Sequence, residues 1–177
     1  MTTDNLNTAS AGTAIAYLMK NYAAYNAWAN TTLINWLRTH PEEVLEKEIS
    51  SSFSGIKPTI FHICQTQVYW LSLIKKETFD WERSFTGTIA EAFDMLIKQS
   101  EEFADAVNQM TTADIEACTL VENPWFKCDF ANFEYIQQVM NHSTYRRGQI
   151  TTITHHLGLT GAPMTDYNYY NIYGKKG

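Results

Sequence analysis

A row of polar side chains at helical spacing holds the residues most able to do chemistry. Gln138, His142 and Arg146 follow one another at intervals of four residues, which places them on one face of an α-helix. Apolar residues lie beside this row, so it borders the face that the helix turns toward a core. A polar group in such a position is costly unless something pairs with it. The row therefore predicts either a binding site between helices or a hydrogen-bonded structural line.

The helix that carries this row is predicted to run from about 132 to 157. Asn132 or Asp129 is suited to cap its start, and Gly158 is suited to the left-handed conformation that ends a helix. Gly148 has no side chain, which favours close approach of a neighbouring helix at that point. The apolar positions recur at intervals of three, four and seven, with one gap: Phe133, Ile136, Val139, Met140, Ile150, Ile153 and Leu157.

Three earlier segments show the same helical periodicity. The first runs from Thr13 to about 39 and is ended by His40-Pro41. The second begins near Pro58, which fits a first helical turn because its missing N–H is not needed there, and continues to about 74. The third follows Thr88, which can form a capping box with Glu91. Four amphipathic helices predict an all-α four-helix bundle, and the connections after the first and third are long enough to cross over.

Between 111 and 129 the helical pattern stops. Two short β-like runs flank Asn123-Pro124, which predicts a short hairpin or an ordered loop between the third and fourth helices. Cys118 and Cys128 could face each other in such a hairpin. Together with Cys64 they make an odd number of cysteines without metal-type spacing, as expected of reduced thiols inside a cell.

The composition limits the classes of partner. The chain carries 13 Lys and Arg against 19 Asp and Glu, and its net charge of −6 opposes the phosphate backbone of nucleic acid. No apolar run approaches the roughly 20 residues of a membrane-spanning helix, and the polar start lacks the pattern of a signal peptide. We expect a cytoplasmic protein that contacts neither nucleic acid nor membrane.

One domain accounts for nearly the whole chain. Its 177 residues suit a single core, predicted to span residues 13–173. Residues 1–12 are almost free of apolar side chains and are expected to form a disordered tail. The tyrosine-rich segment 166–173 should dock on the body of the domain, and residues 174–177 should be mobile.

Several strings of residues resemble the DinB/YfiT-like family of small bacterial four-helix proteins. They are Tyr25-Asn26-Ala27-Trp28-Ala29-Asn30, Phe53-Ser54-Gly55-Ile56, Phe61-His62-Ile63, Tyr69-Trp70-Leu71, Thr165-Asp166-Tyr167 and the long string from Val139 to Ile150 that contains Asn141-His142-Ser143-Thr144-Tyr145-Arg146-Arg147-Gly148-Gln149. The resemblance implies a divalent metal, zinc or nickel, held by three histidines. It also implies activity as a metal-dependent thiol transferase or hydrolase acting with a low-molecular-weight thiol or water, and a homodimer.

Carried over by position, the first two metal ligands fall on His62 and His142, and the third falls on Arg146. A guanidinium is always protonated and cannot ligate a cation. Three readings stay open. Another residue could complete the metal site, with Gln138 and Tyr145 as candidates. Arg146 could turn the pocket, which would also include Tyr69, into an anion site in a non-catalytic binding or dimerising bundle. Alternatively, Arg146 could simply pair with a carboxylate or extend into solvent.

Overall fold

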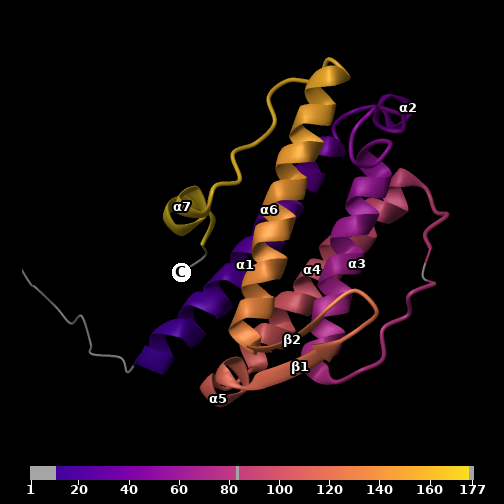
Figure 1. Ribbon diagram of the computed structural model, residues 1–177. Coiled ribbons are helices and arrows are strands. Elements are labelled where there is room, and N and C mark those ends of the chain that lie inside the picture. Colours follow the sequence, from indigo (N-terminus) through magenta and orange to yellow (C-terminus); the bar gives the residue numbers. More distant parts are fainter. Residues whose placement is uncertain (1–10, 83, 176–177) are drawn as a thin grey trace, which may run out of the picture.

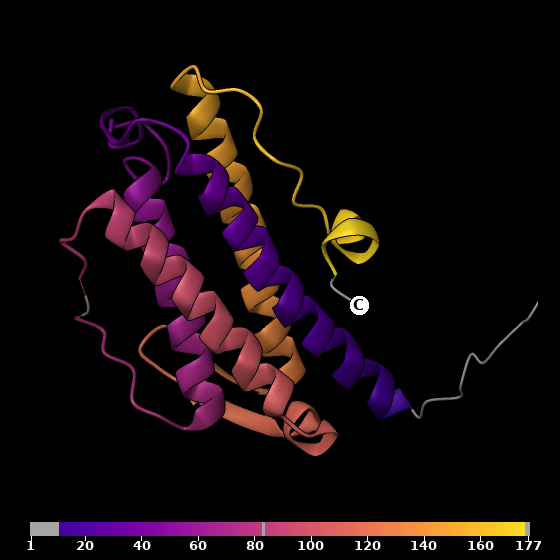
Figure 2. The same ribbon diagram turned by 180° about the vertical axis from the view of Figure 1, so that it is seen from behind.

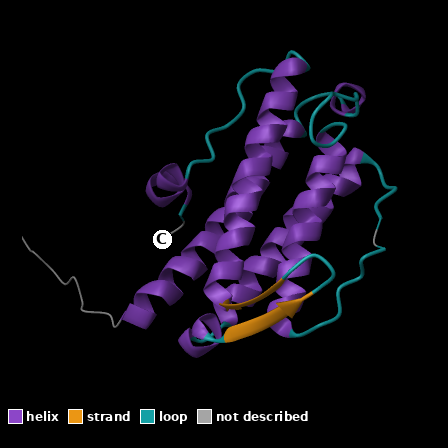
Figure 3. Cartoon of the chain, viewed as in Figure 1, coloured by secondary structure: helices purple, strands orange, loops and turns teal. Residues whose placement is uncertain are grey.

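The computed structural model describes residues 11–82 and 84–175. For residues 11 and 12 it describes the backbone alone. Helices dominate it, and one small hairpin lies near the foot of the helices (Figures 1 and 3). In chain order the elements are α1 (Ala11–Leu37), α2 (Glu42–Leu45), α3 (Ile56–Lys75), α4 (Ile89–Gln109), α5 (Thr112–Glu116), β1 (Cys118–Glu122), β2 (Lys127–Ala131), α6 (Asn132–His156), α7 (Tyr167–Tyr169) and the single π-helical turn η1 (Tyr170–Gly174). The predicted all-α bundle with an insertion before the last long helix is confirmed.

The four long helices form a bundle in which α1 and α6 run one way and α3 and α4 run the other. Each of α1 and α3 packs against both α4 and α6, so α1 and α3 lie diagonally opposite each other. Residues 76–82 and 84–88 run along the outside of the bundle, and α4 begins beside the start of α3 (Figure 2). The order up-down-down-up therefore has its crossover after the second long helix, and not after the first or third, where the sequence allowed one.

The ends of the helices follow from local chemistry. Thr88 and Glu91 form the predicted capping box at the start of α4, with mutual side-chain to backbone hydrogen bonds. Gly158 has a φ of +79° just beyond α6, as its predicted role requires. By contrast, neither Asn132 nor Asp129 caps α6. Asn132 instead bonds Thr119 and the Asp114 carbonyl, tying α6 to the hairpin and α5.

The first helix begins at Ala11, two residues earlier than predicted. Of the two expected tails, residues 1–10 and 176–177 lie outside the described residues. The parts that are described are ordered: residues 11 and 12 are helical, and Lys175 donates a hydrogen bond to the Tyr17 hydroxyl at 2.9 Å.

The core consists of two apolar layers with a polar layer between them. The layer near α2 is built around Leu33, Ile60, Phe93 and Ile153, and the layer near the hairpin around Phe103, Val107, Ile136 and Val139. Between them lie buried polar side chains from all four long helices: Asn26, Asn30, Gln67, Gln99, Ser100 and Arg147. Buried polar groups must find partners within the protein, so this layer fixes how the four helices face one another.

The insertion between α4 and α6 is the predicted hairpin, preceded by a helix that the sequence reading missed. Helix α5 begins with a second capping box, formed by Thr111 and Asp114. The hairpin register places Cys118 opposite Ala131 and Cys128 opposite Val121, so the two cysteines do not face each other, and both are free thiols.

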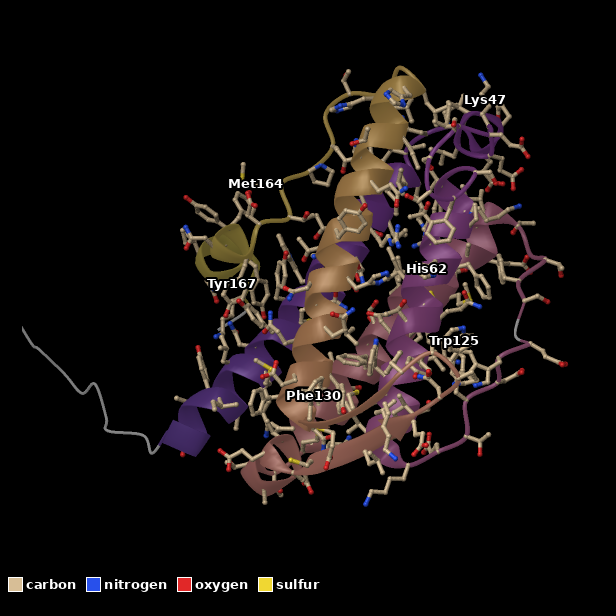
Figure 4. The ribbon with its side chains drawn as sticks, viewed as in Figure 1. Lys47, His62, Trp125, Phe130, Met164 and Tyr167 are labelled. Carbon is tan, nitrogen blue, oxygen red and sulfur yellow. The ribbon has the colours of Figure 1, made fainter. Side chains whose placement is uncertain are left out.

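The tyrosine-rich segment docks on α1 as predicted (Figure 4). The ring of Tyr167 meets that of Tyr22 edge-on with centroids 4.4 Å apart, and the Tyr25 hydroxyl donates to the Thr165 carbonyl at 2.8 Å. Asn21 adds two side-chain hydrogen bonds, to Tyr167 and Asn171. None of the helices in residues 11–82 and 84–175 combines the length and the apolar character needed to cross a bilayer.

Candidate functional site between α3 and α6

The structure brings His62, His142 and Arg146 together between two neighbouring helices. His62 lies on α3, whereas His142 and Arg146 lie one turn apart on α6 (Figure 4 marks His62). The Nε2 atoms of the two histidines are 3.0 Å apart. The Arg146 Nε lies 3.1 Å from Nε2 of His142, and one terminal nitrogen lies 3.4 Å from Nε2 of His62. One edge of the guanidinium thus spans both imidazoles.

These contacts fix the protonation of His142. An Arg N–H can only donate, so Nε2 of His142 accepts and its proton resides on Nδ1. That Nδ1 is buried and has no hydrogen-bond partner among the described residues. A buried donor without an acceptor is costly. The site therefore keeps an unfavourable polar atom on its inner side.

Both imidazoles are held in the neutral form near pH 7. Burial, first, and the neighbouring His62 and Arg146 together lower the pKa of His142 to about 4. Burial and the charge of Arg146 also lower the pKa of His62. The guanidinium is consequently the charged group of the trio.

Arg146 is held in place from several sides. Its guanidinium donates to the Gln149 side chain at 3.0 Å and lies over the rings of Phe53 and Tyr145, with its central carbon 4.9 and 5.0 Å from their centroids. Such cation–π contacts favour a planar cation. The ion pairs among the described residues involve other side chains, so Arg146 has no carboxylate partner there.

A divalent metal does not fit these residues as they stand. The two Nε2 atoms are about as close as two tetrahedral zinc ligands, for which bond lengths of 2.0–2.1 Å give a separation of roughly 3.3 Å. The third position, however, holds the fixed positive charge of Arg146. Within the described residues, no group of three or more His, Cys, Asp or Glu is placed to hold a metal ion.

The other predicted pocket residues are only partly brought together. Gln138 is exposed, and no contact with the histidines is found for it. Tyr145 is 65% exposed and touches the site only through its ring contact with Arg146. Tyr69 lies two turns from His62 on α3, and its hydroxyl accepts a hydrogen bond from Asn123 in the hairpin turn at 3.0 Å. It lines a pocket that begins at His62.

This pocket has a volume of about 260 Å³ and mainly aromatic walls. One wall is α3, and the other is the connection between α3 and α4. The lining includes His62, Thr66, Tyr69, Trp70, Phe79 and Trp81. The sequence reading assigned the tryptophans to the core and the ends of the bundle, and so missed Trp81 and Phe79 as pocket walls.

Arg147, which belongs to the family-like string on α6 but was given no role, donates several hydrogen bonds near the site. Arg147 is 3% exposed and donates to Asn26, Asn30, Tyr25 and Thr144 at 2.9–3.0 Å. All four acceptors are neutral. Burial lowers the pKa of Arg147, opposed by its contact with Tyr25. Arg146 and Arg147 therefore point into different surroundings, one into the site and one into the polar layer. The sequence held one indication that Arg147 is buried: on a helix, position 147 lies 100° from position 146, toward the apolar face.

Fold and site together define a four-helix bundle protein with a histidine and arginine cluster between two helices. The model of the DinB family matches residues 6–174, and the chain belongs to that family. Protein DinB of Bacillus subtilis (strain 168) is 28% identical over 158 residues, which cover 82% of this chain and 89% of that protein. The crystal structure of a DinB-like protein of Bacillus subtilis, YjoA, matches with a TM-score of 0.59 and 10% identity over 86% of this chain and 98% of that one. That identity supports a shared fold alone.

Proposed function

We propose that this DinB-family chain is a non-catalytic, metal-independent binding protein for a small carboxylate, with Arg146 as the anion-binding group. The observation that carries the proposal is the fixed, unpaired guanidinium. Of its five N–H groups, one donates to His142, one donates to Gln149 and a third lies near His62, so at least two have no acceptor among the described residues. A carboxylate accepts two such bonds side by side.

The surroundings of Arg146 support an anion rather than a cation. The two histidines are neutral near pH 7, and Nε2 of His142 accepts a hydrogen bond from the Arg146 Nε. The rings of Phe53 and Tyr145 lie against the guanidinium. Partial burial strengthens a charge-assisted hydrogen bond because less water competes for it.

Titration with propionate and with inorganic phosphate, followed by calorimetry, tests this function. The chain should bind propionate, and Arg146→Gln should lose most of that affinity. Arg38→Gln is the matched control, since Arg38 is a surface arginine that pairs with Asp94. Equal binding by Arg146→Gln and the unchanged protein would contradict the proposal. Preference for phosphate would keep the anion site and change its ligand.

A second candidate is the metal-dependent thiol transferase or hydrolase of the family resemblance. It is favoured by the 3.0 Å separation of the two Nε2 atoms, which suits two ligands of one ion. It requires the Arg146 guanidinium to move away from the two imidazoles and a further metal ligand to take its place. Elemental analysis of the protein after incubation with zinc or nickel and desalting decides between the two: about one metal per chain supports this candidate and contradicts the first.

We also propose a homodimer. Large apolar side chains are exposed on the hairpin, where Phe130 is 53% and Leu120 57% exposed. Sedimentation velocity should give the mass of two chains, and Phe130→Ser should weaken the association. A single-chain mass at micromolar concentration would contradict it. The cytoplasmic location and the absence of nucleic-acid contact stay predictions.

A further inference from the structure

The aromatic pocket adjoins the Arg146 site at His62, which belongs to both. Nε2 of His62 faces Arg146, and the same side chain lines the pocket of about 260 Å³. Tyr69, Phe79 and Trp81 form the far wall, with pairwise ring centroids 4.9–5.1 Å apart. A single elongated ligand can therefore touch the guanidinium and the aromatic rings at once.

The pocket wall is held by contacts from two segments that are distant in sequence. The connection after α3 supplies Phe79 and Trp81. The hairpin turn supplies Trp125, whose ring lies 5.1 Å from that of Trp81. Asn123 fixes this turn by accepting from the backbone N–H groups of Trp125 and Phe126 while donating to the Tyr69 hydroxyl. Figure 4 shows Trp125 at the hairpin turn, where the turn comes near this connection.

These rings are exposed at a cost that a ligand would relieve. Trp81 is 56% and Trp125 is 70% exposed, although tryptophan gains free energy when its ring is covered. The faces of aromatic side chains offer offset or edge-to-face contact to another ring. Among the described residues that line the pocket, none is acidic, so none would repel an anion.

We propose that the ligand is an aromatic carboxylate, with its carboxylate at Arg146 and its ring against the rings of Tyr69 and Trp81. This proposal rests on the proposed function and adds the class of ligand. Thr66 and Tyr69 lie roughly 6 and 10 Å along α3 from His62 at about 1.5 Å per residue. The ring is therefore joined to the carboxylate by a short chain. Because a cavity of about 150 Å³ holds benzene, this pocket accommodates one ring or two fused rings.

Calorimetric titration of the full chain with three probes tests the proposal. The probes are 3-phenylpropionate, propionate, which lacks the ring, and 3-phenylpropanamide, which lacks the charge. We expect 3-phenylpropionate to bind about tenfold more tightly than either of the other two, the gain expected of one aromatic contact. Trp81→Ala should remove this advantage over propionate. Tyr173→Ala, which removes a 71% exposed ring on the C-terminal segment, is the matched control and should change neither.

Each other outcome overturns the proposal in a distinguishable way. Equal affinity for propionate and 3-phenylpropionate would support the anion site and contradict the aromatic site. Equal affinity for the acid and the amide shows a ring site without the anion function. Absence of binding by all three probes removes both. If Trp81→Ala changes the sedimentation coefficient and leaves probe binding intact, the aromatic surface is an interface between chains.

Discussion

His62 on α3 and His142 on α6 direct their Nε2 atoms at each other across 3.0 Å, and Arg146 spans both from the side. Two neutral imidazoles and one guanidinium thus share a space that a family resemblance would assign to a metal ion. Arg at position 146, where the family resemblance implies His, changes the net charge of the site. Three imidazoles attract a cation, whereas this trio carries a positive charge of its own.

Restoring a histidine at position 146 should create a metal site. Arg146→His places a third imidazole one helical turn from His142, and we expect about one zinc or nickel per chain after desalting, measured by elemental analysis. Arg146→Gln removes the charge without supplying an imidazole and should bind no metal tightly. The double change Arg146→His with His62→Ala should lose the metal again. Failure of Arg146→His to retain metal would show that α3 and α6 do not hold the ligands in a usable geometry.

Stability should fall as the solution becomes acidic, because His142 resists protonation only in the folded chain. Its pKa is about 4 when folded against an ordinary value of 6.5, so the unfolded chain binds the proton more readily below pH 6.5. The contribution is fully present above pH 6.5 and is lost as the pH falls toward 4. We expect a loss of about 1–2 kcal/mol, reduced from the full shift by solvent screening.

Urea unfolding near pH 7 and near pH 5 measures this loss. In His142→Gln the decline between the two pH values should be smaller. His155→Gln, at an exposed position near the end of the same helix, should leave the decline as it is. An unchanged pH dependence in His142→Gln would assign the acid sensitivity to other groups.

Arg147 should matter for stability far more than its surface counterparts do. Arg147→Met would leave the buried oxygens of Asn26, Asn30 and Tyr25 without their donor, and we expect a loss of about 2–4 kcal/mol in the free energy of unfolding. Arg38→Met removes only a surface ion pair and should cost less than about 1 kcal/mol. Comparable losses in the two variants, measured by chemical denaturation, would mean that the polar layer contributes little.

Substitution by Ala should have opposite effects on stability at two glycines, Gly148 within α6 and Gly158 just after it. Gly148 is helical and exposed, and a Cβ added there meets nothing within 4 Å. The predicted close helix approach at Gly148 is therefore wrong, and Gly148→Ala should stabilise the chain by about 0.5–1 kcal/mol. Gly158→Ala must adopt a φ of +79° and should destabilise it by about 1 kcal/mol. Thermal unfolding distinguishes the two, and the same sign for both would contradict this account.

Periodicity was sufficient to locate the long helices because each buries one face. It also identified the His62, His142 and Arg146 trio once the family resemblance supplied the pairing of α3 with α6. Local spacing could not reveal partners distant in sequence. Phe53 covers Arg146 from the loop before α3, and Asn123 reaches Tyr69 from the hairpin.

Other features were missed for different physical reasons. The short helix α5 has one buried residue, Ile115, so it has too little periodicity to detect. The parallel arrangement of α3 and α4 depends on the path of the connection between them, whereas the sequence indicated possible crossovers only after the first and third long helices. Arg147 was given no role, because its acceptors Asn26, Asn30 and Tyr25 lie on α1, about 120 positions away in the sequence.

The docking of the C-terminal segment on α1 has a consequence for synthesis of the chain. Asn21, Tyr22 and Tyr25 receive their partners from residues about 140 to 150 positions later, at Thr165, Tyr167 and Asn171. While the ribosome is still making α3 and α4, this aromatic face of the first helix has no native cover. The aromatic face of α1 therefore stays exposed on the nascent chain, or bound by a chaperone, until the segment that follows α6 has emerged.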